Sequence, residues 1–282
     1  NGDSITWTNG GSSGTKYTYT REFGDGTAPQ SLEGAVQEVN LSVEGNGYTL
    51  DIHEMAIDQN GCGAVTFTLS NPNGVNYYKP AAEIGELVLY GEEEQGIGTP
   101  DMKFGEEWAD RRCTIDKDTS SDTVINGTMY FASMDRERGL QHAVTWNIQW
   151  TEGEGEDAKL FEASTPEFSV GTYVDTKELH SDDSSLEISP FSIQAHIPDL
   201  GYEAVDNKLT VTYKDGSEQI IEDDDAGAYN FYVSMARNSG ENIWVPTRLI
   251  NVDQVVSVTL EGTRCTSTGE TETEVPFTIV YS

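Results

Sequence analysis

The sequence predicts an all-β protein, and three features of the chain support this fold class. Apolar and polar residues alternate with a period of two in most segments, as they do in half-buried strands. Turn-forming residues, among them many of the 28 glycines, separate these segments at intervals of roughly ten residues. No long run of residues combines a helical period with caps. Many short strands joined by turns favour β-sandwiches.

The first half of the chain contains a series of predicted strands. In VNLSVEGNGYTLDI (39–52), apolar residues alternate on both sides of an EGNG turn, which predicts a hairpin with one apolar face. The segment AVTFTLSNPNG (64–74) continues with a strand and an Asn-Pro-Asn-Gly turn. Further strands are predicted at 86–90, 127–131 and 144–150, and a short helical turn is expected near DRERGLQ (135–141). In the last strand Trp146 and Trp150 share a face with Val144 and Ile148, so we expect core packing rather than a glycan-binding platform.

The segment TEGEGEDAKLFEASTP (151–166) changes the character of the chain. It begins polar and rich in glycine and glutamate, closes on a proline, and suits a long hairpin tip or a linker. A new series of strands begins after it. The sequence therefore predicts two β-sandwich domains in tandem, an N-terminal domain with insertions at 1–165 and a C-terminal immunoglobulin-like domain at 166–282. The second has the ~100 residues typical of the immunoglobulin fold.

The predicted C-terminal domain has its own strand and turn signals. In LEISPFSIQAHI (186–197) a proline interrupts the alternation, which predicts a bulge or an edge strand around Pro190. LTVTYKDGSEQII (209–221) predicts a hairpin with Asp215-Gly216 as a two-residue turn, so that Val211 lies opposite Ile220. Strands are also predicted at 255–262 and 275–281, with a helical turn near NVDQV (251–255).

The charge balance excludes some partners. The chain carries 16 basic and 49 acidic residues, for a formal net charge of −33. Such a surface repels phosphate backbones and anionic lipid head groups, so we expect neither nucleic-acid binding nor electrostatic docking to a membrane. A basic partner or cations are the complementary classes.

The cysteine count and the chain start bear on location. Cys62, Cys113 and Cys265 cannot all pair within one chain, and their spacing matches no metal site, which leaves one disulfide or three thiols open. The chain contains no secretory signal and no apolar window long enough to span a membrane. It opens on Asn1 and its first methionine is Met55, so we expect a processed or truncated form whose upstream part held a signal or an anchor.

No residue pattern predicts catalysis, cofactor binding or a metal site. HEM (53–55) begins like a zinc-protease motif, but no second histidine follows His53, and His142, His180 and His196 are scattered. Two acidic clusters offer oxygen ligands for calcium, but neither has the spacing of a known calcium loop, and we expect both to be solvated. These clusters are Asp116, Asp118 and Asp122, and the block Asp223, Asp224 and Asp225.

Four segments resemble a family of extracytoplasmic domains of unknown function from single-pass membrane proteins of low-GC Gram-positive bacteria. They are YTLDIHEMAIDQNGCGAVTFTLSNPNGV (48–75), ISPFSIQAHI (188–197), LTVTYKDGSEQII (209–221) and RLINVDQVVSVTLEGT (248–263). The shared signatures are turns and core strands without an active site. The resemblance implies an outer, immunoglobulin-like part of a protein anchored by an N-terminal span, and some such proteins look like anti-sigma factors.

The expected function is therefore that of a non-enzymatic ectodomain with a sensory or interaction role, resembling an anti-sigma factor, at the cell surface. Its partner is an unknown protein or a cell-envelope ligand, and no cofactor is expected. A cell-surface adhesin or glycan-binding module is one alternative. A secreted hydrolase with an unrecognised carboxylate pair is the other, and it requires two carboxylates at a glycosidase separation in a deep cleft.

Overall fold

The computed structural model describes residue 32 and residues 34–83, 85–90, 96–153, 157–182, 184–196, 204–222, 232–236, 241–246, 248–268 and 271–282. Over this part of the chain the protein is mostly β, which confirms the predicted all-β class. The two expected helical turns are present as α2 (Arg136–Gln141) and a 3-10 turn (Val252–Gln254). A further short helix, α1 (Lys79–Glu83), was not predicted.

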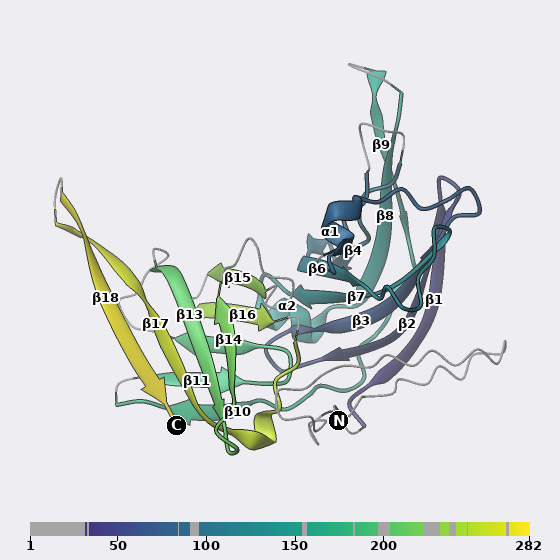
Figure 1. Ribbon diagram of the computed structural model, residues 1–282. Coiled ribbons are helices and arrows are strands. Elements are labelled where there is room, and N and C mark those ends of the chain that lie inside the picture. Colours follow the sequence, from purple (N-terminus) through teal and green to yellow (C-terminus); the bar gives the residue numbers. More distant parts are fainter. Residues whose placement is uncertain are drawn as a thin grey trace.

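The first half of the chain forms two sheets that enclose one core, and we call this unit the N-terminal sandwich (Figure 1). Its larger sheet has the order β1 (Gln37–Gly45), β2 (Tyr48–Ile57), β3 (Cys62–Ser70), β7 (Val124–Ala132) and β6 (Asp110–Ile115). Its smaller sheet has the order β5 (Glu107–Trp108), β4 (Asp101–Phe104), β8 (Val144–Glu152) and β9 (Lys159–Ser164).

The second half repeats this plan, and we call it the C-terminal sandwich. One sheet has the order β10 (Lys177–His180), β11 (Ser185–Ile188), β12 (Ile193–His196), β16 (Glu241–Pro246) and β15 (Tyr232–Ala236). The other has the order β14 (Glu218–Glu222), β13 (Ala204–Tyr213), β17 (Val255–Thr268) and β18 (Thr271–Tyr281). Adding nine to each strand number of the N-terminal sandwich gives the C-terminal order, so the two units share one topology.

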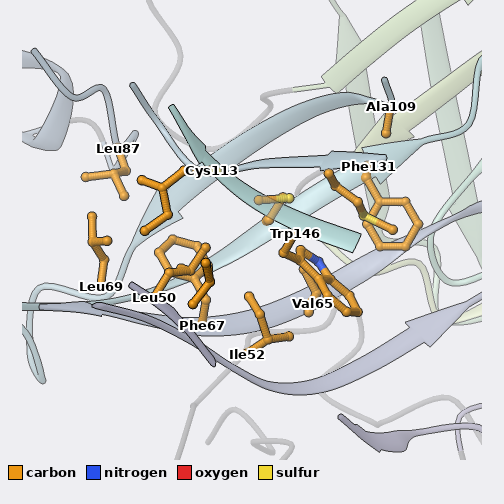
Figure 2. Close-up of a cluster of buried hydrophobic side chains, with 14 of the residues drawn as sticks. Leu50, Ile52, Val65, Phe67, Leu69, Leu87, Ala109, Cys113, Phe131 and Trp146 are labelled. Atoms are coloured by element: carbon orange, nitrogen blue, oxygen red, sulfur yellow. The ribbon is translucent and has the colours of Figure 1, made fainter. Parts of the chain in front are cut away.

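The core of the N-terminal sandwich follows from the alternation of its strands. Leu50 and Ile52 of β2 and Val65 and Phe67 of β3 point inward and are fully buried (Figure 2). Trp146 of β8 closes this core from the opposite sheet, as predicted, and its side chain is fully buried. The predicted hairpin at 39–52 is confirmed, because β1 pairs with β2 through a tight turn with positive φ at Asn46 and Gly47.

Two local predictions in the C-terminal sandwich were wrong, the bulge or edge strand around Pro190 and the two-residue turn at Asp215-Gly216. Pro190 lies in neither a bulge nor an edge strand but in the turn between β11 and β12, where the Ser189 amide donates to the Ser192 carbonyl at 2.9 Å. The hairpin at 209–221 has a three-residue loop rather than a two-residue turn, since the Tyr213 amide donates to the Ser217 carbonyl and only Gly216 has positive φ there. A two-residue turn of the predicted kind needs positive φ at its first residue as well.

The longer loop shifts the register of this hairpin by one residue. Val211 lies opposite Gln219 rather than Ile220, whose partner is Thr210. The Asp223–Asp225 block that follows the hairpin lies outside the described residues. A smaller correction concerns 86–90, which forms isolated bridges instead of the predicted strand.

The two sandwiches contact each other through the outer faces of their larger sheets. Strand β7 lies against β16, and β6 lies against β15. The contact is apolar, and the two sheets approach closely because several of its side chains are small. The interface cluster consists of Leu32, Ala35, Ala56, Cys62, Ala64, Tyr130, Ala132 and Val174 with Phe191, Ile243, Val245 and Leu249 of the C-terminal sandwich. Strand β3 is consequently buried on both faces.

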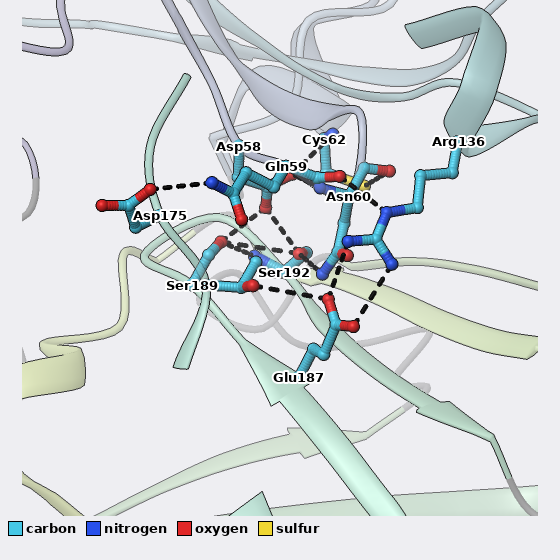
Figure 3. Close-up of polar contacts among 10 residues, drawn as sticks. Asp58, Gln59, Asn60, Cys62, Arg136, Asp175, Glu187, Ser189 and Ser192 are labelled. Carbon is cyan, nitrogen blue, oxygen red and sulfur yellow. Dashed lines mark hydrogen bonds and ion pairs between the residues drawn. The ribbon is translucent and has the colours of Figure 1, made fainter. Parts of the chain in front are cut away.

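A buried carboxylate lies in this interface (Figure 3). Asp58, which follows β2, is fully buried, and one of its oxygens accepts hydrogen bonds from the amides of Asn60 and Cys62 at 2.8 and 2.9 Å. The other oxygen accepts from the hydroxyls of Ser189 and Ser192 at 2.5 and 2.6 Å. Burial raises the pKa of Asp58 above its usual value, and the four hydrogen bonds act in the opposite direction. One side chain thereby joins both sandwiches.

Three further polar contacts lie around Asp58. Arg136 of α2 forms a two-pronged ion pair with Glu187 of β11, with nitrogen–oxygen distances of 3.2 and 3.1 Å. The Arg136 Nε also donates to the Gln59 carbonyl at 2.8 Å. The side-chain amide of Gln59 in turn donates to the Asp175 carboxylate at 2.7 Å. The fork geometry of arginine adds orientation to the contact as well as energy.

The last strand of the N-terminal sandwich, β9, ends at Ser164, and the first strand of the C-terminal sandwich, β10, begins at Lys177. The chain between them stays on the N-terminal sandwich: the Thr165 amide donates to the Trp146 carbonyl, and Phe168 and Val174 form bridges to Val144 and Asp58. That the chain divides into an N-terminal domain at 1–165 and a C-terminal immunoglobulin-like domain at 166–282 stays a prediction.

Removal of the Asp58 carboxylate should destabilise the protein far more than its replacement by an amide. The Asp58→Ala variant leaves two amides and two hydroxyls buried without an acceptor, and we expect it to lose about 3 kcal/mol of unfolding free energy. The Asp58→Asn variant should lose only about 1 kcal/mol, because the amide oxygen accepts from the backbone while its NH₂ donates to the Ser192 hydroxyl oxygen. Urea denaturation measures both values. Equal stability of the alanine variant and the wild type would contradict this role.

Candidate functional site

The N-terminal sandwich contains an open cavity of about 540 Å³ beside α1. One wall belongs to the long connection between β3 and β4, and the other to the end of β6 and the loop that leads to β7. Its volume lies within the range of small-molecule sites. The lining residues are Tyr77, Lys79, Ala82, Glu83, Ile115, Lys117, Ser120, Ser121 and Asp122.

Two lysines connect the walls of the cavity. The Lys79 ammonium forms an ion pair with Asp122 at 3.2 Å, donates to the Tyr77 hydroxyl at 2.8 Å and lies 4.0 Å from the centre of the Tyr77 ring. The hydrogen bond from Lys79 to Tyr77 is the main cause of the raised pKa of Lys79. From the opposite wall, the Lys117 ammonium donates to the Glu83 carbonyl at 2.7 Å, at the end of α1.

Asp116 holds the loop that forms the second wall. One of its oxygens accepts from the Asp118 amide at 3.0 Å and the other from the Thr119 hydroxyl at 2.9 Å. Ser120 adds a second anchor, since its hydroxyl donates to the Asn126 carbonyl and accepts from the Asn126 amide. The loop therefore has a defined shape before any ligand is bound.

The cavity offers both hydrogen-bond donors and acceptors on a partly apolar floor. Its two ammonium groups are matched by the carboxylates of Glu83 and Asp122, so the formal local charge is zero in a chain whose net charge is −33. Ile115 and Ala82 supply apolar surface. Such a lining suits a ligand that is itself polar, both donating and accepting, and without a strong net charge.

The first acidic cluster does not converge on a point. The Asp116 oxygens accept hydrogen bonds from residues of their own loop, while Asp122 pairs with Lys79. Among the described residues, no group of three or more histidine, cysteine, aspartate or glutamate side chains is arranged to hold a metal ion. Asp116, Asp118 and Asp122 therefore form no such group, and the second cluster, Asp223–Asp225, lies outside the described residues.

Cys62 and Cys113 are both buried thiols. The Cys62 sulfur contacts the Asn60 carbonyl at 3.8 Å, and the Cys113 sulfur contacts the Pro100 carbonyl at 3.7 Å. Burial raises the pKa of Cys113 to about 12, so this thiol is protonated at neutral pH and is a poor nucleophile. The side chain of Cys265 lies outside the described part of the chain.

His53 lies in a ladder of hydrogen bonds on the outer face of the larger N-terminal sheet. Its Nε2 lies 2.8 Å from the Thr68 hydroxyl, which itself donates to the Asn126 side-chain oxygen at 2.7 Å. Because the Thr68 proton is directed to Asn126, the imidazole serves as a donor and does not activate the hydroxyl as a base would. His180 is exposed, and the side chain of His196 lies outside the described residues.

Sequence reasoning singled out Asp116 and Asp122, but it missed the lysines of the cavity and the polar residues of the interface. Lys79 and Lys117 lie on segments far apart in the chain, and no local pattern links them. The one local signal was NYYKP (76–80), where a lysine and a proline after two tyrosines mark the start of α1. Sequence reasoning likewise assigned no role to Asp58, Ser189 or Ser192.

Comparison of the chain with family models, with curated proteins and with solved structures finds no match. Within the described residues, no helix has the length and apolar character needed to cross a membrane.

Glu54 should make stability depend on pH. It lies half-buried opposite Glu38 in the β1–β2 pair, and burial together with the Glu38 charge raises its pKa to about 7 from the usual 4.5. The folded state thus holds this proton more tightly than the unfolded state, so the contribution of Glu54 to stability falls as pH rises from about 4.5 to about 7.

The Glu54→Gln variant removes this titration. Relative to the wild type it should gain ~1 kcal/mol of unfolding free energy between pH 4.5 and pH 8, after allowance for solvent screening of a half-exposed group. Denaturation curves across this range provide the measurement, with Glu44→Gln on the same hairpin as the exposed control. A pH profile of Glu54→Gln parallel to that of the wild type would be inconsistent with the raised pKa.

Proposed function

We propose that this chain is a non-enzymatic, extracytoplasmic binding ectodomain built from two immunoglobulin-like sandwiches, with the cavity beside α1 as its sensory site. The strand order supports the architecture. Relabelling β11, β12, β16 and β15 as A, B, E and D, and β13, β17 and β18 as C, F and G, reproduces the two sheets of an immunoglobulin domain. The same relabelling applies to the N-terminal sandwich.

The location rests on the resemblance of segments such as LTVTYKDGSEQII to extracytoplasmic domains of single-pass membrane proteins. In this proposal an upstream segment anchors the chain, and the sandwiches face the cell exterior. Control of a sigma factor is part of the same proposal. The acidic surface is compatible with an exposed soluble part and disfavours lying on anionic lipid.

The single observation that carries the binding role is the charge-balanced lining of the cavity. Each wall carries one lysine donor and one carboxylate acceptor, Lys79 with Glu83 and Lys117 with Asp122, and this pairing matches the donor and acceptor character of hydroxyl groups. We therefore assign the ligand to neutral, polyhydroxylated small molecules such as saccharides. An anion would meet Glu83 and Asp122, and a cation would meet Lys79 and Lys117.

The two alternatives receive less support. A glycan platform needs exposed coplanar tryptophans, but Trp146 and Trp244 are buried and Trp108 alone among the described tryptophans is counted as exposed. A hydrolase needs a buried acid beside a second carboxylate. Asp122, one of the two carboxylates in the cavity, has a side chain that is 90% exposed and forms an ion pair with Lys79.

Neutral saccharides should bind in the cavity. Glucose and N-acetylglucosamine, titrated to millimolar concentrations, should shift the NMR signals of the backbone amides of Ser120 and Ser121, whereas glucuronate and glucosamine should shift them less. The Lys79→Met variant should weaken binding about tenfold through loss of ~1.4 kcal/mol. Lys214→Met, at an exposed lysine of the C-terminal sandwich, should leave binding unchanged. Binding that is insensitive to Lys79→Met, or no shift with any of the four sugars, would refute this assignment.

The chain should be accessible from outside the cell. In intact cells of the organism that encodes it, externally added protease should remove the epitope of an antibody raised against the two sandwiches, while a cytoplasmic marker stays intact. Protection of the epitope until the cells are lysed would contradict the extracytoplasmic location.

A further inference from the structure

Strand β9 forms the edge of its sheet, and no described strand pairs with its outer side. The Thr165 amide donates to the Trp146 carbonyl, which fixes the alternation of the preceding residues. In the β8–β9 register, the backbone N–H and C=O groups of Ala163 and Phe161 point toward β8. Those of Glu162 and Leu160 therefore present their N–H and C=O groups to the free side.

The side chains of β9 are also available. Leu160 is 60% exposed and Phe161 is 38% exposed, in a chain that otherwise buries most of its large apolar residues in three clusters. Figure 1 shows the β8–β9 hairpin extending away from the rest of the molecule. An exposed edge with apolar side chains is a template for pairing with another strand.

Contacts within the hairpin hold this edge in place. Phe161 stacks on Trp150 with ring centres 5.7 Å apart and an interplanar angle of 14°. On the other face Glu162 accepts from Lys103 at 2.6 Å and from Gln149 at 3.1 Å. The strand is thus preorganised, which lowers the entropy lost when a partner adds to it.

The equivalent edge of the C-terminal sandwich is already engaged. By topology β18 corresponds to β9, and the residue after β18, Ser282, exchanges both backbone hydrogen bonds with His180 of β10. In the C-terminal sandwich the residue that follows this edge strand thus already has a backbone partner. In the N-terminal sandwich no described residue exchanges such a pair of bonds with the free side of β9.

Charge selects the class of partner. A second copy of the chain would bring its own net charge of −33, and pairing two such bodies is electrostatically unfavourable. The described charged residues of the β8–β9 hairpin are the acidic Glu152, Asp157 and Glu162 and one lysine, Lys159. A segment with basic side chains alternating with apolar ones would meet opposite charge and cover Leu160.

We propose that β9 is a docking strand to which a partner protein adds an extended segment of alternating basic and apolar residues, in the manner of β-augmentation. The partner gains main-chain hydrogen bonds at Leu160, Glu162 and Ser164. This interaction uses a different surface from the cavity beside α1 and does not depend on the ligand proposed there.

A short capped peptide that alternates lysine and valine is the direct probe. It should bind the full chain and shift the NMR signals of the Leu160 and Glu162 amides. The same peptide N-methylated at alternate residues cannot donate along one edge and should bind at least about tenfold more weakly, as should its glutamate–valine counterpart. Salt should weaken binding of the lysine peptide.

A variant pair tests the strand itself. The Leu160→Pro variant removes an N–H that points to the free side, where an edge strand tolerates proline, so the fold should be preserved and peptide binding lost. Leu160→Val keeps the N–H and should bind like the wild type. The N-methylated peptide answers the same question if Leu160→Pro does not fold.

Three results would overturn the proposal. The first is the absence of binding by the lysine peptide, and the second is binding that ignores both N-methylation and Leu160→Pro. The third is a dimer of the wild type, seen by sedimentation and lost in Leu160→Pro, because it would make a second copy the occupant of this edge.

Discussion

The buried carboxylate of Asp58 is the constraint on which the arrangement of the two sandwiches depends. A charge taken out of water must have its oxygens satisfied, and the turn after β2 provides donors for only one of them. The other is satisfied by Ser189 and Ser192, which lie in the β11–β12 turn of the other sandwich. The two units therefore cannot slide past each other without leaving these buried polar groups unpaired. The contacts around Ala64 and Ile243 bury apolar surface, while the hydrogen bonds of the carboxylate fix the orientation of one sandwich relative to the other.

The shared topology explains why the two halves nevertheless differ in their surfaces. Both sandwiches use the same strand order, but the connection from β3 to β4 spans residues 71–100, whereas its counterpart from β12 to β13 spans only 197–203. The longer connection carries α1 and builds one wall of the cavity. The opposite wall follows β6, next to which the same connection is bridged through Glu86 and Thr114. A local insertion on a repeated scaffold thus gives one sandwich a candidate site, since loops carry specificity on a rigid frame.

The sequence was informative where structure depends on local alternation. The β1–β2 hairpin and the helical turn at 136–141 follow from periodicity and turn residues, and Trp146 was expected in the core for the same reason. Prediction failed where a residue count within a turn decides the outcome. Because the loop that ends at Gly216 is one residue longer than predicted, Val211 lies opposite Gln219 instead of Ile220. At Pro190, the rule that proline disrupts a strand was correct, but the disruption is a complete turn between two short strands.

The interface and the cavity were beyond sequence reasoning for a different reason. Asp58 is separated from Ser189 by 131 residues, and no local pattern distinguishes a serine in a solvated turn from one that satisfies a buried carboxylate. Thr66 and Thr68 of β3 are polar, yet both are buried on the outer face of this strand. The spatial meeting of Lys79 with Asp122 likewise depends on tertiary structure.

Native-state hydrogen exchange of four amides tests the central claim most directly. The amides of Asn60 and Cys62 donate to Asp58, and those of Phe191 and Ser192 donate to the Ser189 hydroxyl. If the Asp58 cluster joins the two sandwiches into one body, all four should exchange only through global unfolding, with the same free energy as the central strands β3 and β12. Exchange of these turn amides through local opening, several kcal/mol below that of the strands, would show that the two sandwiches are not held together by the buried carboxylate.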